Sequence, residues 1–257
     1  MRHLITTGIL LGALGSNAQV APAGWYDISP DWTTTGIDGN TYHLYEMLDN
    51  GYTVVLDFST TWCPPCATLN WGRALDSLHV IDGPGGLNKV MVFLVESDPT
   101  TDMADLDGSS QGTPEGNTLG DWITGTTHPI IDDASIAELY HVIGYPTLYS
   151  ICPSRMIRPL TTYNGWAGTY ASLHEQCMEC DHHEADSPHD ATLLGANEVV
   201  WCAGPEVPLS TRLYNVGTEP ITTATIEVVA ENQNNEVVST ATWTGSLATY
   251  EQVQVDL

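Results

Sequence analysis

The segment from Trp62 to Cys66, with the sequence Trp-Cys-Pro-Pro-Cys, most strongly constrains the fold of this chain. It follows the apolar run from Val54 to Phe58, which predicts a strand buried on both faces. Pro64 favours the start of a helix directly after Cys63. A helix N-terminus favours a thiolate, which is the attacking species in disulfide exchange. The spacing therefore predicts a reversible disulfide where a strand gives way to a helix.

Strand and helix patterns alternate between about residue 25 and residue 177, which predicts a central mixed sheet flanked by helices, an α/β fold. The polar, Gly-rich stretch at 98–117 predicts a long loop. The further expected strands are at 90–95, 148–151 and 156–161, the last as an antiparallel edge strand. The expected helices are at 42–48, 64–79, 135–141 and 170–177.

The pattern changes after residue 190, where apolar residues recur at every second position. Val207, Leu209, Thr211 and Leu213 are one such series, and turn residues separate the series. This alternation predicts a small all-β sandwich, which we expect to be incomplete at its C-terminal end. The predicted organisation is a signal peptide at 1–18, an α/β domain at 19–180, a linker at 181–192 and a β-sandwich module at 193–257.

The first 18 residues have a short basic start, a short apolar run and a small-residue cleavage site, as in secretory signal peptides. We therefore expect export to the periplasm, or to the outer surface or exterior of a Gram-negative-type bacterium.

Six Lys and Arg against 32 Asp and Glu give a net charge of −26. Because such a surface repels nucleic acid and anionic lipid, neither is an expected partner. No stretch is long and apolar enough to predict a membrane span, so no membrane insertion is expected. The charge is explained by solubility of a secreted protein, and an acidic surface for a cationic partner or calcium is the alternative explanation.

Two more segments complete a pattern with the Trp62–Cys66 segment. The strand Val55–Phe58 precedes it, and the turn Gly144–Thr147 (Gly-Tyr-Pro-Thr) lies far downstream. Together they resemble the thioredoxin superfamily. A short β-hairpin predicted upstream, with Asp38-Gly39 as its turn, and the segment Pro129–Asp132 resemble its exported TlpA/ResA-like redoxin branch. The resemblance covers about residues 25–177 and implies a thioredoxin-like domain. The C-terminal strands resemble Ig-like modules of bacterial surface and secreted proteins.

The resemblance implies roles for three residues at the cysteine pair. Cys63 is the nucleophile, and Cys66 resolves the mixed disulfide. Asp57 lies buried beneath the disulfide and moves a proton to or from the second sulfur. Burial raises the pKa of a carboxyl group, which suits acid–base chemistry near neutral pH. Leu94 stands where many thioredoxins have a lysine as ion partner of that acid.

The Gly144–Thr147 turn carries the expected substrate contacts. The resemblance implies a cis peptide bond before Pro146, which places Tyr145 beside the disulfide and leaves backbone groups free to pair with a substrate strand. We expect Trp62, Tyr145 and Thr147 to bind substrate. The chemistry needs no metal or organic cofactor, and the expected partners are protein thiols or disulfides and an electron donor or acceptor.

Four cysteines remain, and in an exported chain we expect structural disulfides from them. Cys177 and Cys180 close a predicted helix, where the dipole disfavours a thiolate. A relay redox pair, or a zinc site with the adjacent histidines at 182 and 183, is an alternative. In the layout that the resemblance implies, Cys152 and the last helix end away from the active site. We therefore expect Cys152 to pair with Cys177 or Cys180, and Cys202 to pair with the other.

The loop at 98–117 has aspartates at 98, 102, 105 and 107, and closely spaced carboxylates of this kind can bind calcium. It lacks the late glutamate of an EF-hand, so we expect a solvated acidic loop.

The sequence as a whole predicts an exported thiol–disulfide oxidoreductase acting on proteins through Cys63 and Cys66. Two alternatives stay open: a non-catalytic surface or binding protein on a redoxin scaffold, and a thiol peroxidase-type redoxin.

Overall fold

The computed structural model describes residues 23, 27–110, 112–160, 169–180, 187–194, 209–230 and 236–257. The predicted signal peptide, the first half of the predicted linker, His182, His183 and Cys202 lie outside these residues. Within the described ranges, no helix has both the length and the apolar character that crossing a membrane requires.

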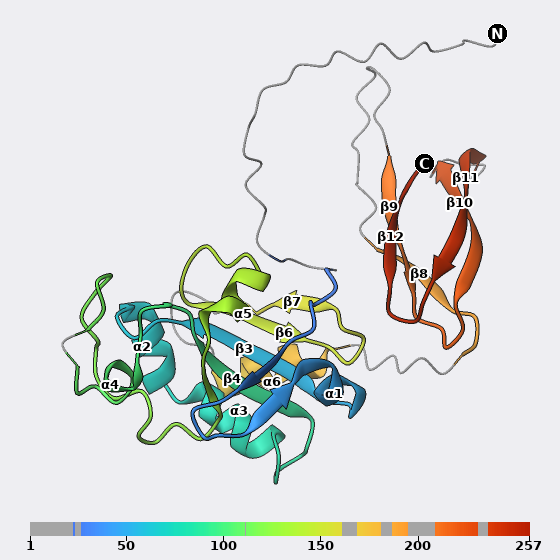
Figure 1. Ribbon diagram of the computed structural model, residues 1–257. Helices are drawn as coiled ribbons and strands as arrows, with labels where there is room; N and C mark the ends of the chain where they lie inside the picture. The colour runs from blue at the N-terminus through green and yellow to red at the C-terminus, as the bar shows by residue number, and fades with distance from the viewer. Residues whose placement is uncertain are drawn as a thin grey trace, which may run out of the picture.

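A five-stranded sheet forms the centre of the first domain, in the order β5-β4-β3-β6-β7 (Figure 1). β3, β4 and β5 run parallel, whereas β6 runs antiparallel to β3 and β7 runs antiparallel to β6. All seven residues of β3 are buried, as its apolar sequence predicts. The strands are β3 (Thr53–Ser59), β4 (Val90–Glu96), β5 (Ile130–Asp132), β6 (Thr147–Ile151) and β7 (Ile157–Pro159).

Helices cover both faces of this sheet, which confirms the predicted thioredoxin-like α/β fold. α1 and α5 pack on one face, and α2, α3 and α6 pack on the other. A short hairpin, β1 (Thr33–Thr35) and β2 (Thr41–His43), precedes α1. The helices are α1 (Leu44–Asp49), α2 (Pro64–Trp71), α3 (Ala74–Asp82), α4 (Met103–Leu106), α5 (Ala134–Leu139) and α6 (Tyr170–Met178).

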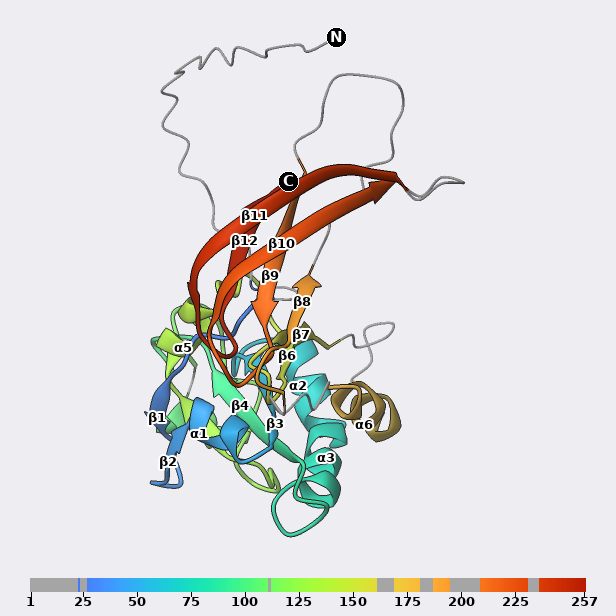
Figure 2. The same ribbon diagram turned by 90° about the vertical axis from the view of Figure 1, so that its right-hand side faces the viewer.

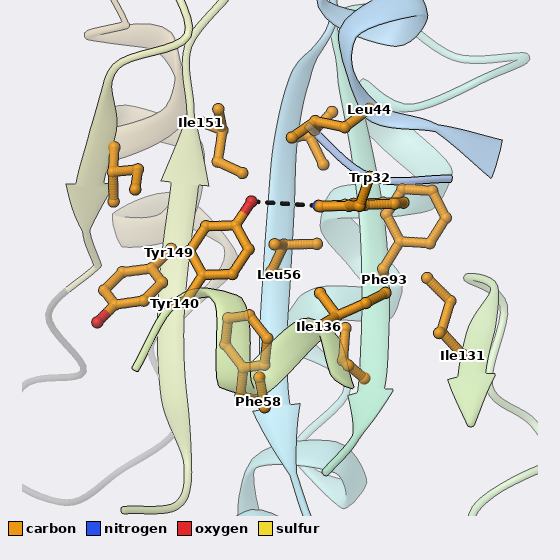
Figure 3. Close-up of a cluster of buried hydrophobic side chains, with 14 of the residues drawn as sticks. Trp32, Leu44, Leu56, Phe58, Phe93, Ile131, Ile136, Tyr140, Tyr149 and Ile151 are labelled. Carbon is orange, nitrogen blue, oxygen red and sulfur yellow. Dashed lines mark hydrogen bonds between the residues drawn. The ribbon is translucent and has the colours of Figure 1, made fainter. Parts of the chain in front are cut away.

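Aromatic side chains fill the core between the sheet and α5 (Figure 3). Phe58 on β3 packs against Tyr140 and Tyr149, with ring centroids 5.3 and 5.9 Å away. The indole of Trp32 donates a hydrogen bond to the Tyr140 hydroxyl (3.2 Å), so its buried N–H is paired. Because Val54, Leu56 and Phe58 face this cluster, the alternating residues of β3 point to the opposite face.

The helix predicted at 64–79 is wrong in one respect, because it is two helices. α2 ends at Trp71 with Gly72 as its C-cap residue, and Arg73 adopts a left-handed conformation with φ of 58°. The Arg73 guanidinium then donates to Asp76 (3.1 Å) in the first turn of α3. The 98–117 stretch is also not a plain loop, because Asp102 and Asp105 form a reciprocal capping box that starts α4.

From residue 187 onward, the described residues form strands and turns and no helix, which agrees with the predicted all-β module. β8 (Ala191–Leu194), β9 (Ser210–Asn215) and β12 (Gln252–Asp256) make one sheet, and β10 (Ile221–Ala230) pairs with β11 (Glu236–Leu247). Figure 2 shows the long β10–β11 hairpin beside β9 and β12. The two sheets share a buried apolar cluster, so they pack face to face. An Ig-like topology stays a prediction.

This module contacts the α/β domain at the turn between β6 and β7. The Tyr214 hydroxyl donates to the Ser154 carbonyl, and Arg212 pairs with Asp27 (2.7 Å). The Arg155 guanidinium lies 4.0 Å from the ring centroid of Tyr45 and 5.2 Å from that of Tyr250. Because Ile151 pairs with Val54 at the start of β3, these contacts lie at the end of the sheet remote from the Cys63–Cys66 pair.

Candidate active site

Cys63 and Cys66 form a disulfide at the N-terminus of α2, with Cα atoms 5.2 Å apart. Cys63 is the N-cap residue, and its sulfur accepts a hydrogen bond from the Cys66 backbone N–H (3.3 Å). Pro64 and Pro65 have no N–H, so Cys66 supplies the first backbone donor of this helix. Both cysteines are buried, Cys63 at 4% exposure and Cys66 at 0%. The geometry suits a thiolate at Cys63 once the bond is reduced.

Asp57 lies on β3, on the face of the sheet that carries α2. Its carboxyl is completely buried, and burial raises its pKa to about 7. The Ser59 hydroxyl donates a hydrogen bond to it (2.7 Å), which lowers the pKa and partly opposes the effect of burial. Its other oxygen has no partner among the described residues. Leu94 on β4 pairs with Asp57 in the sheet and packs in the same cluster as both cysteines. Asp57 therefore lies in an apolar environment close to the disulfide cluster.

The Tyr145–Pro146 peptide bond is cis, in agreement with the expectation from the sequence. The Tyr145 ring packs against the cluster that contains the cysteines and meets the Trp62 ring edge to face, with centroids 6.3 Å apart. The Thr147 hydroxyl donates to the Gly144 carbonyl (2.7 Å) and so closes this turn. The fold thus brings Trp62 and Tyr145 together at the cysteine pair, while the Thr147 hydroxyl bonds within its own turn.

The acidic loop packs against Trp62 instead of lying in solvent, so the prediction of a solvated loop is wrong in this part. The Trp62 indole donates to Asp98 (2.8 Å), and Thr113 donates to the same oxygen (2.9 Å). A Cβ atom on Gly116 would lie 2.8 Å from the Cβ of Trp62, so only glycine fits this contact. Asp98 and Asp105 are buried. Among the described residues, no three potential metal-ligating side chains form a group.

Sequence reasoning missed Glu96, a second buried carboxyl at the end of β4. It is 1% exposed, and burial raises its pKa to about 8. Its Oε1 accepts hydrogen bonds from the Asp98 backbone N–H (3.0 Å) and the Thr101 hydroxyl (3.1 Å). The signal that could have revealed it is the one used for Asp57, an acid within or directly after a buried apolar run.

A second disulfide joins Cys152, after β6, to Cys180, after α6; Cys180 is one of the two partners expected for Cys152. This bond contradicts both a Cys177–Cys180 redox relay and a zinc site that uses Cys180. Cys177 is buried and forms no disulfide with another described cysteine. Burial raises the pKa of its thiol to about 12, which disfavours a thiolate. The expected pairing of Cys202 lies outside the described residues.

No family model matches the chain, and no curated protein matches it. Among solved structures, it is similar to the thioredoxin domain of a thiol-disulfide oxidoreductase from Bacteroides vulgatus, with 15% identity and a TM-score of 0.40 over 60% of this chain and 98% of the other. A secreted disulfide oxidoreductase from Mycobacterium tuberculosis has 17% identity and a TM-score of 0.41, and the match covers 57% of this chain and 94% of the other. An exposed lipoprotein thioredoxin from Streptococcus pneumoniae has 19% identity and a TM-score of 0.39, and the match covers 58% of this chain and 99% of the other.

Proposed function

We propose that this chain is an exported thiol–disulfide oxidoreductase that acts on proteins through Cys63 and Cys66. The observation that carries the proposal is the disulfide at the N-terminus of α2, with Cys63 as the cap and Cys66 as the first backbone donor. A passive staple does not need either sulfur at a helix N-terminus. Export is part of the proposal because the first 18 residues have the composition of a signal peptide.

In the reducing direction, the Cys63 thiolate attacks one sulfur of a substrate disulfide. The substrate S–S bond breaks, a mixed disulfide to Cys63 forms, and the second substrate sulfur leaves as a thiolate that takes up a proton. The Cys66 thiolate then attacks the sulfur of Cys63 and releases the first substrate sulfur. Two electrons pass from the cysteine pair to the substrate, and the Cys63–Cys66 bond forms again. The reverse sequence oxidises a substrate dithiol.

Asp57 is the group that we assign to proton transfer at Cys66. The Cys66 thiol must lose its proton before it attacks, and a carboxylate on the same face of the sheet can accept it. A pKa of about 7 means that Asp57 gains and loses a proton with little free-energy change near neutral pH. Its oxygen without a hydrogen-bond partner among the described residues is the one that we expect to take that proton.

Trp62 and Tyr145 form the apolar wall against which we expect a substrate chain to lie. Their rings meet edge to face at the cysteine pair. Pro146 has no N–H, so it presents no donor that competes for the sulfurs, and the backbone of its turn is available for strand-like pairing. Thr147 closes that turn through its hydroxyl and so supports its shape.

Insulin reduction by dithiothreitol tests the proposal, with the full chain as catalyst and turbidity as the readout. We expect the wild-type chain to accelerate precipitation and Cys63→Ser to abolish the acceleration. Cys177→Ser is the control, because that thiol is buried away from the pair and should not alter the rate. If Cys63→Ser is as active as the wild-type chain, the proposal is wrong and a binding role on this scaffold remains.

A further inference from the structure

Hydrogen bonds connect the buried Glu96 to the indole beside the disulfide. Oε1 of Glu96 accepts from the Asp98 backbone N–H (3.0 Å) and from the Thr101 hydroxyl (3.1 Å). The Asp98 carboxylate accepts from Nε1 of Trp62 (2.8 Å). The Glu96 carboxyl therefore fixes the turn that carries the hydrogen-bond acceptor of Trp62.

The same turn also contacts Tyr145. The Tyr145 hydroxyl donates to the carbonyl of Ser97 at 3.4 Å, and Ser97 stands between Glu96 and Asp98 in the sequence. The Tyr145 and Trp62 rings contact each other edge to face. A movement of the turn would thus displace the partners of both rings at once.

We propose that Glu96 is a positioning residue, which holds Trp62 and Tyr145 beside the Cys63–Cys66 pair in the orientation that receives substrate. The inference rests on the proposed function, since it concerns the two rings against which the substrate chain would lie. Glu96 acts through the 97–101 turn, and the proposed role requires no contact between Glu96 and either sulfur.

The groups that face Glu96 make its protonation state important. Asp98 comes from its own turn, Asp132 pairs with it across the sheet from β5, and Tyr145 approaches from the turn before β6. Burial raises the pKa of Glu96 to about 8, and the charges of Asp132 and Asp98 act in the same direction. Glu96 is therefore neutral at pH 7. Above pH 8 it becomes a buried anion beside Asp98 and Asp132, which changes the electrostatic environment of the turn that carries the acceptor of Trp62.

Asp98 does not titrate in this range. Burial would raise its pKa, but hydrogen bonds from Thr100, Trp62 and Thr113 together outweigh burial and lower it. A change at Trp62 above neutral pH therefore reports another group. Asp57, with a pKa of about 7, is a second buried carboxyl that titrates near neutral pH, so its effect must be separated from that of Glu96 by mutation.

The indole N–H resonance of Trp62 gives a direct readout in the full chain labelled with ¹⁵N-tryptophan, and Trp62→Phe assigns it. We expect this resonance to shift with a midpoint near pH 8 in the wild-type chain and in Asp57→Asn. Glu96→Gln keeps an acceptor oxygen without the ionisation, so its resonance should match wild type at pH 6.5 and should not titrate. Glu96→Ala should displace the resonance at every pH. Glu115→Gln removes an exposed carboxyl from the same loop and should behave as wild type.

Insulin kinetics give a second readout. Glu96→Ala should raise KM roughly fivefold, the scale of one net hydrogen bond, with the reduction potential of the cysteine pair unchanged; Glu96→Gln should restore KM at pH 6.5. An unmoved Trp62 resonance in Glu96→Ala, or an unaltered alkaline shift in Glu96→Gln, overturns the positioning role. A wild-type chain that does not reduce insulin refutes the proposed function instead, and the resonance still tests the role of Glu96.

Discussion

Replacing the buried Asp57 by asparagine should change how the stability of the chain depends on pH. Burial raises the folded-state pKa from 3.8 to about 7, so the folded chain holds this proton more tightly than the unfolded chain does. The contribution of Asp57 to stability is therefore greatest at low pH and falls as the pH rises from 3.8 to about 7. Asparagine can still accept the hydrogen bond from Ser59, but it has no proton to lose.

The magnitude follows from the difference between the two pKa values. A shift from 3.8 to about 7 is about 3 pH units. At about 1.36 kcal/mol per unit, the ionised carboxyl destabilises the folded chain by about 4 kcal/mol above pH 7. About 3 kcal/mol of this loss in stability occurs between pH 5 and pH 8. The rest occurs below pH 5, because the loss begins at the unfolded-state pKa of 3.8. The asparagine side chain adds an unpaired amide N–H₂, which costs about 1–3 kcal/mol at every pH and leaves the pH dependence untouched.

Guanidinium unfolding of the oxidised proteins at pH 5 and pH 8 measures this difference. Between these pH values the wild-type chain should lose about 3 kcal/mol more stability than Asp57→Asn. Contributions from Glu96 are common to both proteins and cancel. The exposed Asp107→Asn serves as the matched control and should follow the wild-type curve. Parallel curves for wild type and Asp57→Asn would refute the raised pKa, and with it the proton-transfer role.

Two further predictions concern the end of the sheet remote from Cys63. Replacing Cys152 and Cys180 together by serine removes a bond that spans a sequence separation of 28 residues, and it should lower the free energy of unfolding by about 3–4 kcal/mol, measured by denaturant titration. Insulin reduction should stay unchanged, and its loss would mean that this bond acts in the redox cycle. Arg155→Ala removes the contacts with Tyr45 and Tyr250 and should speed proteolysis between the domain and the β module, while insulin reduction stays within about twofold. Equal proteolysis rates would contradict the importance of that contact.

The parts of the fold that the sequence predicts correctly are those whose signals are local. β3 is buried along its whole length, so its apolar run identified it. Pro64 and the cysteines marked the start of α2 because a helix N-terminus has its own residue preferences. The cis bond at Pro146 came from the family resemblance instead, since the local sequence permits either isomer.

The features that the sequence did not predict depend on contacts between distant residues. Gly72 alone does not end a helix, because a single glycine lowers helix stability by only about 1 kcal/mol. The break before α3 is completed by Arg73, whose guanidinium also reaches Thr126, 53 residues away. The position of Glu96 at the end of a buried apolar strand is a local signal, but the hydrogen bonds that it accepts from Asp98 and Thr101 depend on the conformation of the turn that follows.

Three buried carboxyls near the cysteine pair show why burial alone does not determine protonation. Asp57 receives one hydrogen bond from the described residues and Glu96 receives two, and the pKa of each is raised. Asp98 receives four, from Thr100, Trp62 and Thr113, and its pKa is lowered. Burial is the largest cause of the raised pKa in both, and Glu96 starts from a higher ordinary value than Asp57, 4.5 against 3.8; the charges of Asp132 and Asp98 raise the pKa of Glu96 further. Between about pH 6 and pH 9, the site therefore changes charge at two carboxyls whose effects on Cys66 and on Trp62 can be separated by mutation.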